Sequence, residues 1–193
     1  MTPTRLNALT DGVVAIVLTI MVLELKFPAE PTLHAALAVA PLLAAYLLSF
    51  VNIALYWNNH HHLMSSARKI TGGVLWANHA LLFWLTLVPL VIRWIDEAGI
   101  TAWPVASYGI VLICAGISYQ LLERALIRAE GEGSGVRRAL GGKAKEWISV
   151  GLYAVAIASA FVSPYVSVAC YVAIAILWIV PDRRFEHRAE GSP

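Results

Sequence analysis

A chain of 193 residues and 21.0 kDa ordinarily forms one domain. Its composition, 59% hydrophobic against 13% charged with a mean hydropathy of +0.70, lies far outside the range of soluble globular proteins. Six membrane spans would use about 120 residues, which leaves no room for a soluble catalytic or nucleotide-binding domain. The net charge of +2 argues against a nucleic-acid partner, and Cys114 and Cys170 lie in apolar runs, as packed thiols do.

Charged residues divide the chain into apolar stretches that predict an all-α integral membrane protein. In chain order, the expected spans are residues 4–26, 34–62, 70–95, 103–123, 147–163 and 164–181. Residues 123–146 hold mixed charges and five glycines, which is typical of a loop or partly helical linker. A signal peptide is not expected, because Asp11 interrupts the first apolar stretch and no small-residue cleavage pattern follows it.

The uncharged segment 147–181 forms either one long kinked helix or two short helices that meet at Ser163 and Pro164. Lysine and arginine concentrate on the cytoplasmic side of membrane proteins. With two helices, one side of the membrane collects every basic residue except Lys26 and Arg93, whereas one helix would leave three C-terminal arginines outside. We therefore expect six spans in the plasma membrane, both termini in the cytoplasm, and Pro164 in the first turn of the sixth helix.

The first span has two distinct faces. On a helical wheel, Ile16, Ile20 and Leu23 form a mostly apolar stripe with Thr19 beside it, and the same stripe is extended by Gly12, Leu9 and Arg5. Asp11 and Thr10 point well away from this stripe. Such a stripe is also typical of ordinary helix packing, but a carboxylate inside a span is costly and tends to mark a functional site.

Asp11 needs hydrogen-bond donors near the cytoplasmic end of the first span. Indole, imidazole and amide groups can donate to a carboxylate, and the end of the second span and the start of the third lie at a similar depth. The candidates are Trp57, Asn59, His60, His61, Trp76, Asn78 and His79, with Arg5 and Thr10 on the first helix itself. A satisfied network would hold the base of this helix. Alternatively, the histidines only cap the second helix at the lipid headgroups.

Residues 5–25 resemble a known family. Arg5 and the Leu9-Thr10-Asp11-Gly12 run, followed by VVAIVLTIMVLEL, resemble the Arg-x-x-x-Phe-Ser-Asp signature and first helix of the transmembrane protein 175 family, the endolysosomal potassium channels and their bacterial relatives. The Tyr56-Trp57-x-x-His60-His61 stretch and residues 76–89 resemble that family's second and third helices. Two positions depart from the signature: Thr10 keeps the hydroxyl of serine, but Leu9 lacks the ring of phenylalanine.

The resemblance implies a homotetrameric cation channel in the lipid membrane, with six helices in each subunit and the first helices lining the pore. It places the pore constriction at Ile16, Ile20 and Leu23, and an ion-selectivity layer of hydroxyl groups at Thr19. Permeant potassium ions, without a bound cofactor, would then pass with weak to moderate preference over sodium. Glu24 would raise the cation concentration at the outer mouth, and Arg5 is expected to lie toward a carboxylate or a headgroup.

Other classes of function fit the residues less well. A metal-dependent enzyme would need His60, His61, His62 and His79 to converge with Asp11, but contiguous histidines point about 100° apart on a helix. Neither a metal site nor an enzyme is therefore expected. A secondary cation transporter usually has discontinuous helices or an inverted repeat, and neither is visible. A transporter and a proton-conducting channel remain the alternatives.

Overall fold

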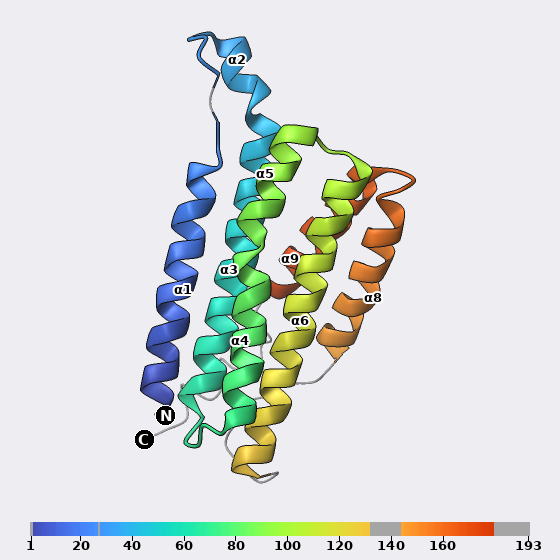
Figure 1. The fold of residues 1–193 in the computed structure, drawn as a ribbon. Helices are drawn as coiled ribbons and strands as arrows, with labels where there is room; N and C mark the ends of the chain where they lie inside the picture. The colour runs from blue at the N-terminus through green and yellow to red at the C-terminus, as the bar shows by residue number, and fades with distance from the viewer. Residues whose placement is uncertain (1, 27, 132–143, 180–193) are drawn as a thin grey trace, which may run out of the picture.

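The computed structural model describes residues 2–26, 28–131 and 144–179, and within these ranges the regular structure is entirely helical. In chain order the helices are α1 (Pro3–Leu23), α2 (Leu33–Ala38), α3 (Ala40–Ser65), α4 (Gly72–Thr86), α5 (Val88–Ala98), α6 (Ala102–Glu130), α8 (Ala144–Ser159) and α9 (Pro164–Ile179). They form a bundle with α1 at one edge and α8 at the other (Figure 1). The central part of the predicted linker and the C-terminal arginines lie outside the described residues.

Four helical stretches of the described chain are long and apolar enough to cross a membrane. They are α1, α3, the α4–α5 pair taken as Gly72–Ala98, and α6. Helices α8 and α9 have 16 residues each, and α9 is a shorter apolar helix. The chain is therefore an all-helical membrane protein, and the expected total of six spans and the side on which the termini lie stay predictions.

Prolines divide two of the expected spans. Pro41 and Pro89 occupy the first turns of α3 and α5, and a proline ring blocks the helical hydrogen bond to the carbonyl four residues earlier. In both cases the N–H group two positions before the proline turns to carbonyls of the preceding turn: Val39 donates to Ala36 and Leu37, and Leu87 donates to Trp84 and Leu85. The second expected span is therefore two helices, α2 and α3, and the third is two consecutive helices, α4 and α5, which together form one stretch long enough to cross a membrane.

Helix α6 lies at the centre of the bundle and packs against α4, α5, α8 and α9. Gly109 allows α9 to come close, because a Cβ atom at this position would lie 2.8 Å from Cζ of Tyr171 and clash with its hydroxyl. That hydroxyl donates to the backbone carbonyl of Val105 at 3.0 Å. Tyr108, on the same part of α6, accepts hydrogen bonds from Ser49 and Asn52 of α3. Buried polar contacts and close helix approach thus hold the centre of the subunit.

Candidate functional site

One face of α1 packs against the rest of the subunit. The buried residues recur every three or four positions, which places them on one side of a helix: they are Leu6, Thr10, Val14, Val17 and Met21. This row contacts α3, α4 and α5. Pro3 in the first turn suits the start of the helix, because its missing N–H would have no helical partner there.

The predicted pore stripe lies on the outward side of α1. Ile16, Ile20 and Leu23 are 58%, 43% and 77% exposed in the single subunit. Thr19 is also exposed, and its hydroxyl donates to the carbonyl oxygens of Ala15 and Ile16 on its own helix, each 2.9 Å away. The lone pairs of the Thr19 hydroxyl oxygen are therefore free to accept hydrogen bonds or contact a cation. Packing within the part of the chain that the structure describes leaves this stripe largely exposed.

A buried hydrogen-bonded chain ties α1 to α3 and α4. His60 of α3 lies 2.8 Å from Oδ1 of Asn78 on α4, and Nδ2 of Asn78 donates to Oγ1 of Thr10 at 3.1 Å. All three side chains are buried. Because an unpaired polar group in this environment costs free energy, the chain fixes the position of α1 against its neighbours.

Asp11 makes a separate contact on a neighbouring face of α1. Its Oδ1 accepts a hydrogen bond from Nε1 of Trp57 on α3 at 2.7 Å. The ring of His61 stacks on that indole, with centroids 5.8 Å apart and planes at 28°. Asp11 itself is exposed. Among residues 2–26, 28–131 and 144–179, the carboxylate thus has the Trp57 indole as its donor, and the side chain remains exposed.

The structure does not bring every expected residue to this network. Trp76 is 78% exposed, and its ring lies beside His79 rather than near Asp11. Arg5 is exposed and forms no ion pair with the described residues of its own subunit. An intrasubunit carboxylate partner for Arg5 is therefore absent from the described part of the chain.

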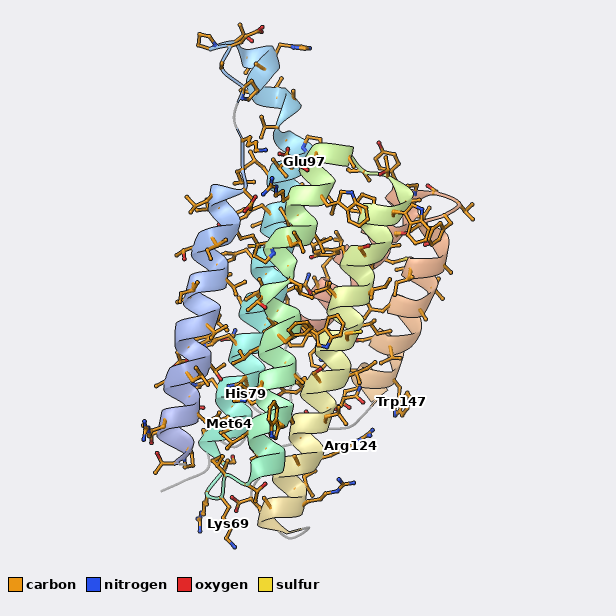
Figure 2. All side chains as sticks on the ribbon, in the orientation of Figure 1. Met64, Lys69, His79, Glu97, Arg124 and Trp147 are labelled. Atoms are coloured by element: carbon orange, nitrogen blue, oxygen red, sulfur yellow. The ribbon has the colours of Figure 1, made fainter. Side chains whose placement is uncertain are left out.

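The end of α1 that carries Glu24 is joined to α5 by ion pairs. Arg93 lies 4.0 Å from Glu24 and 3.0 Å from Glu97, which in turn lies 3.8 Å from Lys26. These side chains are largely solvent-exposed, apart from Glu24 at 25%. Glu97 lies at the opposite end of the bundle from Lys69 and Arg124 (Figure 2). Glu24, the expected mouth residue, is thus partly neutralised by Arg93.

One contact was not predicted from the sequence. Oε1 of Glu130, the last residue of α6, accepts hydrogen bonds from the backbone N–H groups of Arg68 and Lys69 in the loop between α3 and α4. Residues 68 and 130 lie 62 positions apart, so local sequence carries no signal for this contact. These hydrogen bonds stabilise the last turns of α6, which extends to Glu130, beyond the expected end at residue 123.

Among residues 2–26, 28–131 and 144–179, no group of three or more His, Cys, Asp and Glu side chains is arranged to hold a metal ion. The candidate site is therefore the outward face of α1 and the contacts that hold this helix.

Several known proteins are similar to this chain in sequence and in fold. A family model described as "Endosomal/lysosomal potassium channel TMEM175" matches residues 5–89. A protein from Chryseobacterium sp. named a potassium channel is 45% identical over 186 residues, which covers 96% of this chain and 97% of that protein. Another from Streptomyces collinus, also named a potassium channel, is 29% identical and covers 61% of each chain.

The fold is also found in a crystal structure described as a lysosomal potassium-selective channel TMEM175 homolog from Chamaesiphon minutus. The two structures align with a TM-score of 0.74 and 27% sequence identity, over 92% of this chain and 96% of that one. The chain therefore belongs to the endosomal/lysosomal potassium channel TMEM175 family, a family of membrane channels rather than enzymes.

Proposed function

We propose that this protein is a potassium-permeable cation channel of the plasma membrane, assembled as a homotetramer of six-span subunits with both termini in the cytoplasm. Helix α1 of each subunit surrounds the pore, and potassium ions pass without a bound cofactor. Membership of the TMEM175 family and the names of the relatives support conduction of potassium. One pore-lining helix cannot enclose a conduit alone, so several subunits are needed, and four is the number that the family resemblance implies.

The observation that carries this proposal is the outward stripe of α1. Ile16, Ile20 and Leu23 are exposed in the single subunit, and Thr19 adds a hydroxyl group beside them. Asp11 is exposed on a different face, between the stripe and the buried row, and a carboxylate that faces hydrocarbon is costly, so that face of α1 is also expected to meet water or other protein. Gly12, on the stripe, would meet nothing within 4 Å if it carried a Cβ atom, so no contact with the described residues requires a glycine there.

The chemistry of the stripe defines the expected conduction. Rings of Ile16, Ile20 and Leu23 offer a cation no ligands, and a narrow apolar ring resists wetting. The ion must then cross the constriction with its own water. Thr19 adds oxygen atoms whose lone pairs are free, and these hydroxyls favour potassium over sodium only weakly to moderately.

The charge distribution supports the proposed orientation. Lys69 and Arg124 lie at one end of the bundle and Glu97 at the other (Figure 2). Because basic residues concentrate on the cytoplasmic side, the end with Lys69 faces the cytoplasm and Glu24 lies at the outer mouth. The chain from Thr10 through Asn78 to His60 would then hold the inner half of α1 in place.

Flux measurements on constriction variants test the proposal. Wild type, Ile16→Asn, Ile20→Asn and Leu23→Asn are reconstituted in liposomes, and flux is recorded under potassium and sodium gradients. Amide groups in the ring would remove the dewetting barrier, so flux should rise while discrimination between the two ions falls or stays low. Thr19→Val keeps the shape and removes the hydroxyl, so it should lower potassium preference without opening the pore.

Ile176→Asn on α9 is the matched control, because Ile176 is 56% exposed and Ile16 is 58% exposed. This control should fold and leave flux unchanged. If the three Asn substitutions on α1 each left flux unchanged, the pore would have to lie on another helix. A monomer by mass determination in mild detergent would contradict the assembly.

A further inference from the structure

One exposed side of α6 changes from apolar to basic along the helix. Ile110, Ile117 and Leu121 are 42%, 45% and 46% exposed. Arg124 and Arg128 follow on the same side, and both are exposed. The five side chains lie within about 60° of one another on a helical wheel. An apolar helix face that becomes basic at its end is typical of a helix that leaves the hydrocarbon of a bilayer and reaches the headgroups.

A tryptophan on the neighbouring helix marks the depth of this change. In Figure 2, Trp147, Arg124 and Lys69 follow one another toward the lower end of the bundle. Trp147 lies in the first turn of α8, which packs against α6, and its side chain is 64% exposed. Tryptophan is enriched where hydrocarbon meets the headgroups. Arg124 therefore lies just beyond that boundary, at the depth of the lipid phosphates.

The carboxylates of this part of α6 lie on another side of the helix. Glu123 and Glu130 are about 130° around the helix from Arg124 and Arg128. Glu123 is only 7% exposed, and Oε1 of Glu130 accepts hydrogen bonds from two backbone N–H groups of the α3–α4 loop. Among the described residues, neither arginine forms an ion pair. Both guanidinium groups can therefore bind an anion from outside the subunit.

The contact with Glu130 brings two more positive charges to this end of α6. Arg68 and Lys69 donate to Glu130 through their backbone N–H groups, and their side chains stay exposed. Neither side chain forms an ion pair within the part of the chain that the structure describes. Two basic residues of α6 and two of the loop thus lie at the end of an apolar helix face.

From these features, we infer that this side of α6 binds an anionic phospholipid. Arg124 and Arg128 are four positions apart, so their Cβ atoms lie about 5–6 Å apart, and each guanidinium group can form two parallel hydrogen bonds with a phosphate. The lipid phosphate binds between these arginines, and the acyl chains lie along Leu121 and Ile117. A zwitterionic lipid offers the same phosphate but brings a cation close to the four basic side chains, so it binds more weakly.

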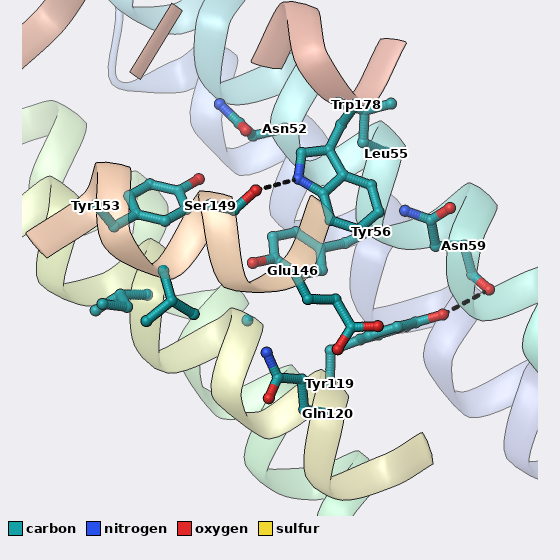
Figure 3. Close-up of a pocket in the computed structure, with 13 residues that line it drawn as sticks. Asn52, Leu55, Tyr56, Asn59, Tyr119, Gln120, Glu146, Ser149, Tyr153 and Trp178 are labelled. Atoms are coloured by element: carbon teal, nitrogen blue, oxygen red, sulfur yellow. Dashed lines mark hydrogen bonds between the residues drawn. The ribbon is translucent and has the colours of Figure 1, made fainter. Parts of the chain in front are cut away.

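The headgroup binds on the surface of the bundle rather than inside it. A crevice between α3, α6, α8 and α9 has a cavity volume of about 70 Å³, far below the 300–1,000 Å³ or so of small-molecule sites (Figure 3). This crevice is too small for a phospholipid headgroup. On the exposed side of α6, acyl chains in the bilayer hold the phosphate beside the arginines. The surface does not include α1, so the inference is independent of the proposed pore.

Native mass spectrometry of the full channel in mild detergent tests the inference, with phosphatidylglycerol and phosphatidylcholine of identical acyl chains titrated separately. Wild type should bind phosphatidylglycerol at least about tenfold more tightly. A basic residue near anionic lipid contributes about fivefold in affinity, so Arg124→Gln and Arg128→Gln should each weaken phosphatidylglycerol binding about fivefold, and the double variant about 25-fold. Phosphatidylcholine binding should change less. Arg93→Gln, a matched charge change on α5, should alter neither.

Two further comparisons keep the test decisive if the glutamine variants fold poorly. The double variant Arg124→Lys with Arg128→Lys keeps both charges and should keep most of the preference for phosphatidylglycerol. A loss as large as that caused by glutamine would indicate distortion of α6 and would overturn the inference.

Glycerophosphoglycerol, the same headgroup without acyl chains, separates a lipid from a soluble anion. At the same concentration as the lipid, it should not displace phosphatidylglycerol from the wild-type channel. Displacement would identify a site for soluble phosphate esters and overturn the inference. Equal binding of the two lipids to wild type, or unchanged phosphatidylglycerol binding by the double glutamine variant, would overturn it as well.

Discussion

Helices α1 and α6 are both long, apolar and able to span a membrane, yet they are packed very differently. The subunit itself buries 50% of the most apolar window of α6 but only 28% of that of α1. Contacts within one subunit explain the buried Tyr108, which accepts hydrogen bonds from Ser49 and Asn52, and Gly109, which lies against Tyr171. The contacts within one subunit cover only the buried row of α1. The opposite face is exposed in the single subunit, and the proposed pore would place it around the conduction path.

Two glycines show the same difference at single positions. A Cβ atom on Gly109 of α6 would clash with the hydroxyl of Tyr171 and lie 2.8 Å from Cγ1 of Ile157. A Cβ atom on Gly12 of α1 would meet nothing within 4 Å. Gly109 is therefore needed by the fold of one subunit, whereas any need for Gly12 would arise in the assembly.

The largest expected effect is on the buried hydrogen-bonded chain that joins α1 to α3 and α4. Asn78→Leu keeps a similar volume but leaves His60 and Thr10 without their partner, at about 1–3 kcal/mol for each group. The free energy of unfolding in detergent should fall accordingly. Asn58→Leu on α3 is the control, because Asn58 is exposed, and it should change stability little. Equal stability of the two variants would show that the buried chain does not hold α1.

Gly109→Ala should have the next largest effect. Overpacking of a filled core costs about 1–3 kcal/mol, and here it also displaces the Tyr171 hydroxyl from the Val105 carbonyl. Gly12→Ala should instead raise the stability of the isolated subunit by up to about 1 kcal/mol, because alanine favours helix. Thermal unfolding in detergent measures both.

The double variant Gly109→Ala with Tyr171→Phe sharpens this test. Tyr171→Phe removes the hydroxyl that would lie closest to a Cβ atom at position 109, but it leaves Cζ in place. It should therefore restore part of the stability that Gly109→Ala removes. No coupling between the two substitutions would contradict the contact between α6 and α9 described here.

Asp11→Ala should have a smaller effect on stability than Asn78→Leu. It removes one partner from the Trp57 indole, a loss of about 1 kcal/mol for a single, partly solvated hydrogen bond. Asp11→Asn keeps an oxygen acceptor and should lose less. Thermal unfolding and the ratio of potassium to sodium flux should be measured together. A fully stable Asp11→Ala channel with altered ion preference would instead place Asp11 in the conduction path.

Much of α1 could be predicted from its sequence, because helical periodicity separates its faces before any partner is known. The wheel places Ile16, Ile20 and Leu23 on a stripe away from Thr10, and the subunit leaves that stripe exposed. Similarly, α9 begins at Pro164, where the sequence expects a sixth helix. These features depend on residues close together in the chain.

Contacts between distant segments could not be predicted in the same detail. The sequence directs all the candidate donors toward Asp11, but the structure separates them into two contacts: Trp57 binds Asp11, and Asn78 binds Thr10. The reason is geometric, because adjacent residues on a helix point about 100° apart and so face different neighbours. Periodicity identifies the face of a side chain but not the helix that lies opposite it.

The smallest expected effect is at the outer end, where Glu24 and Arg93 lie 4.0 Å apart. Exposed ion pairs contribute little to stability, so Glu24→Gln should leave the thermal unfolding midpoint nearly unchanged. Its effect should instead appear in potassium flux at low salt, because a mouth carboxylate raises the local cation concentration. The Debye length falls from about 30 Å at 0.01 M to about 3 Å at 1 M ionic strength, so the difference from wild type should vanish at high salt. Glu97→Gln, farther along the same chain of ion pairs, should lower the flux less. If Glu24→Gln lowered flux equally at both ionic strengths, Glu24 would act by direct contact with the ion rather than through its field.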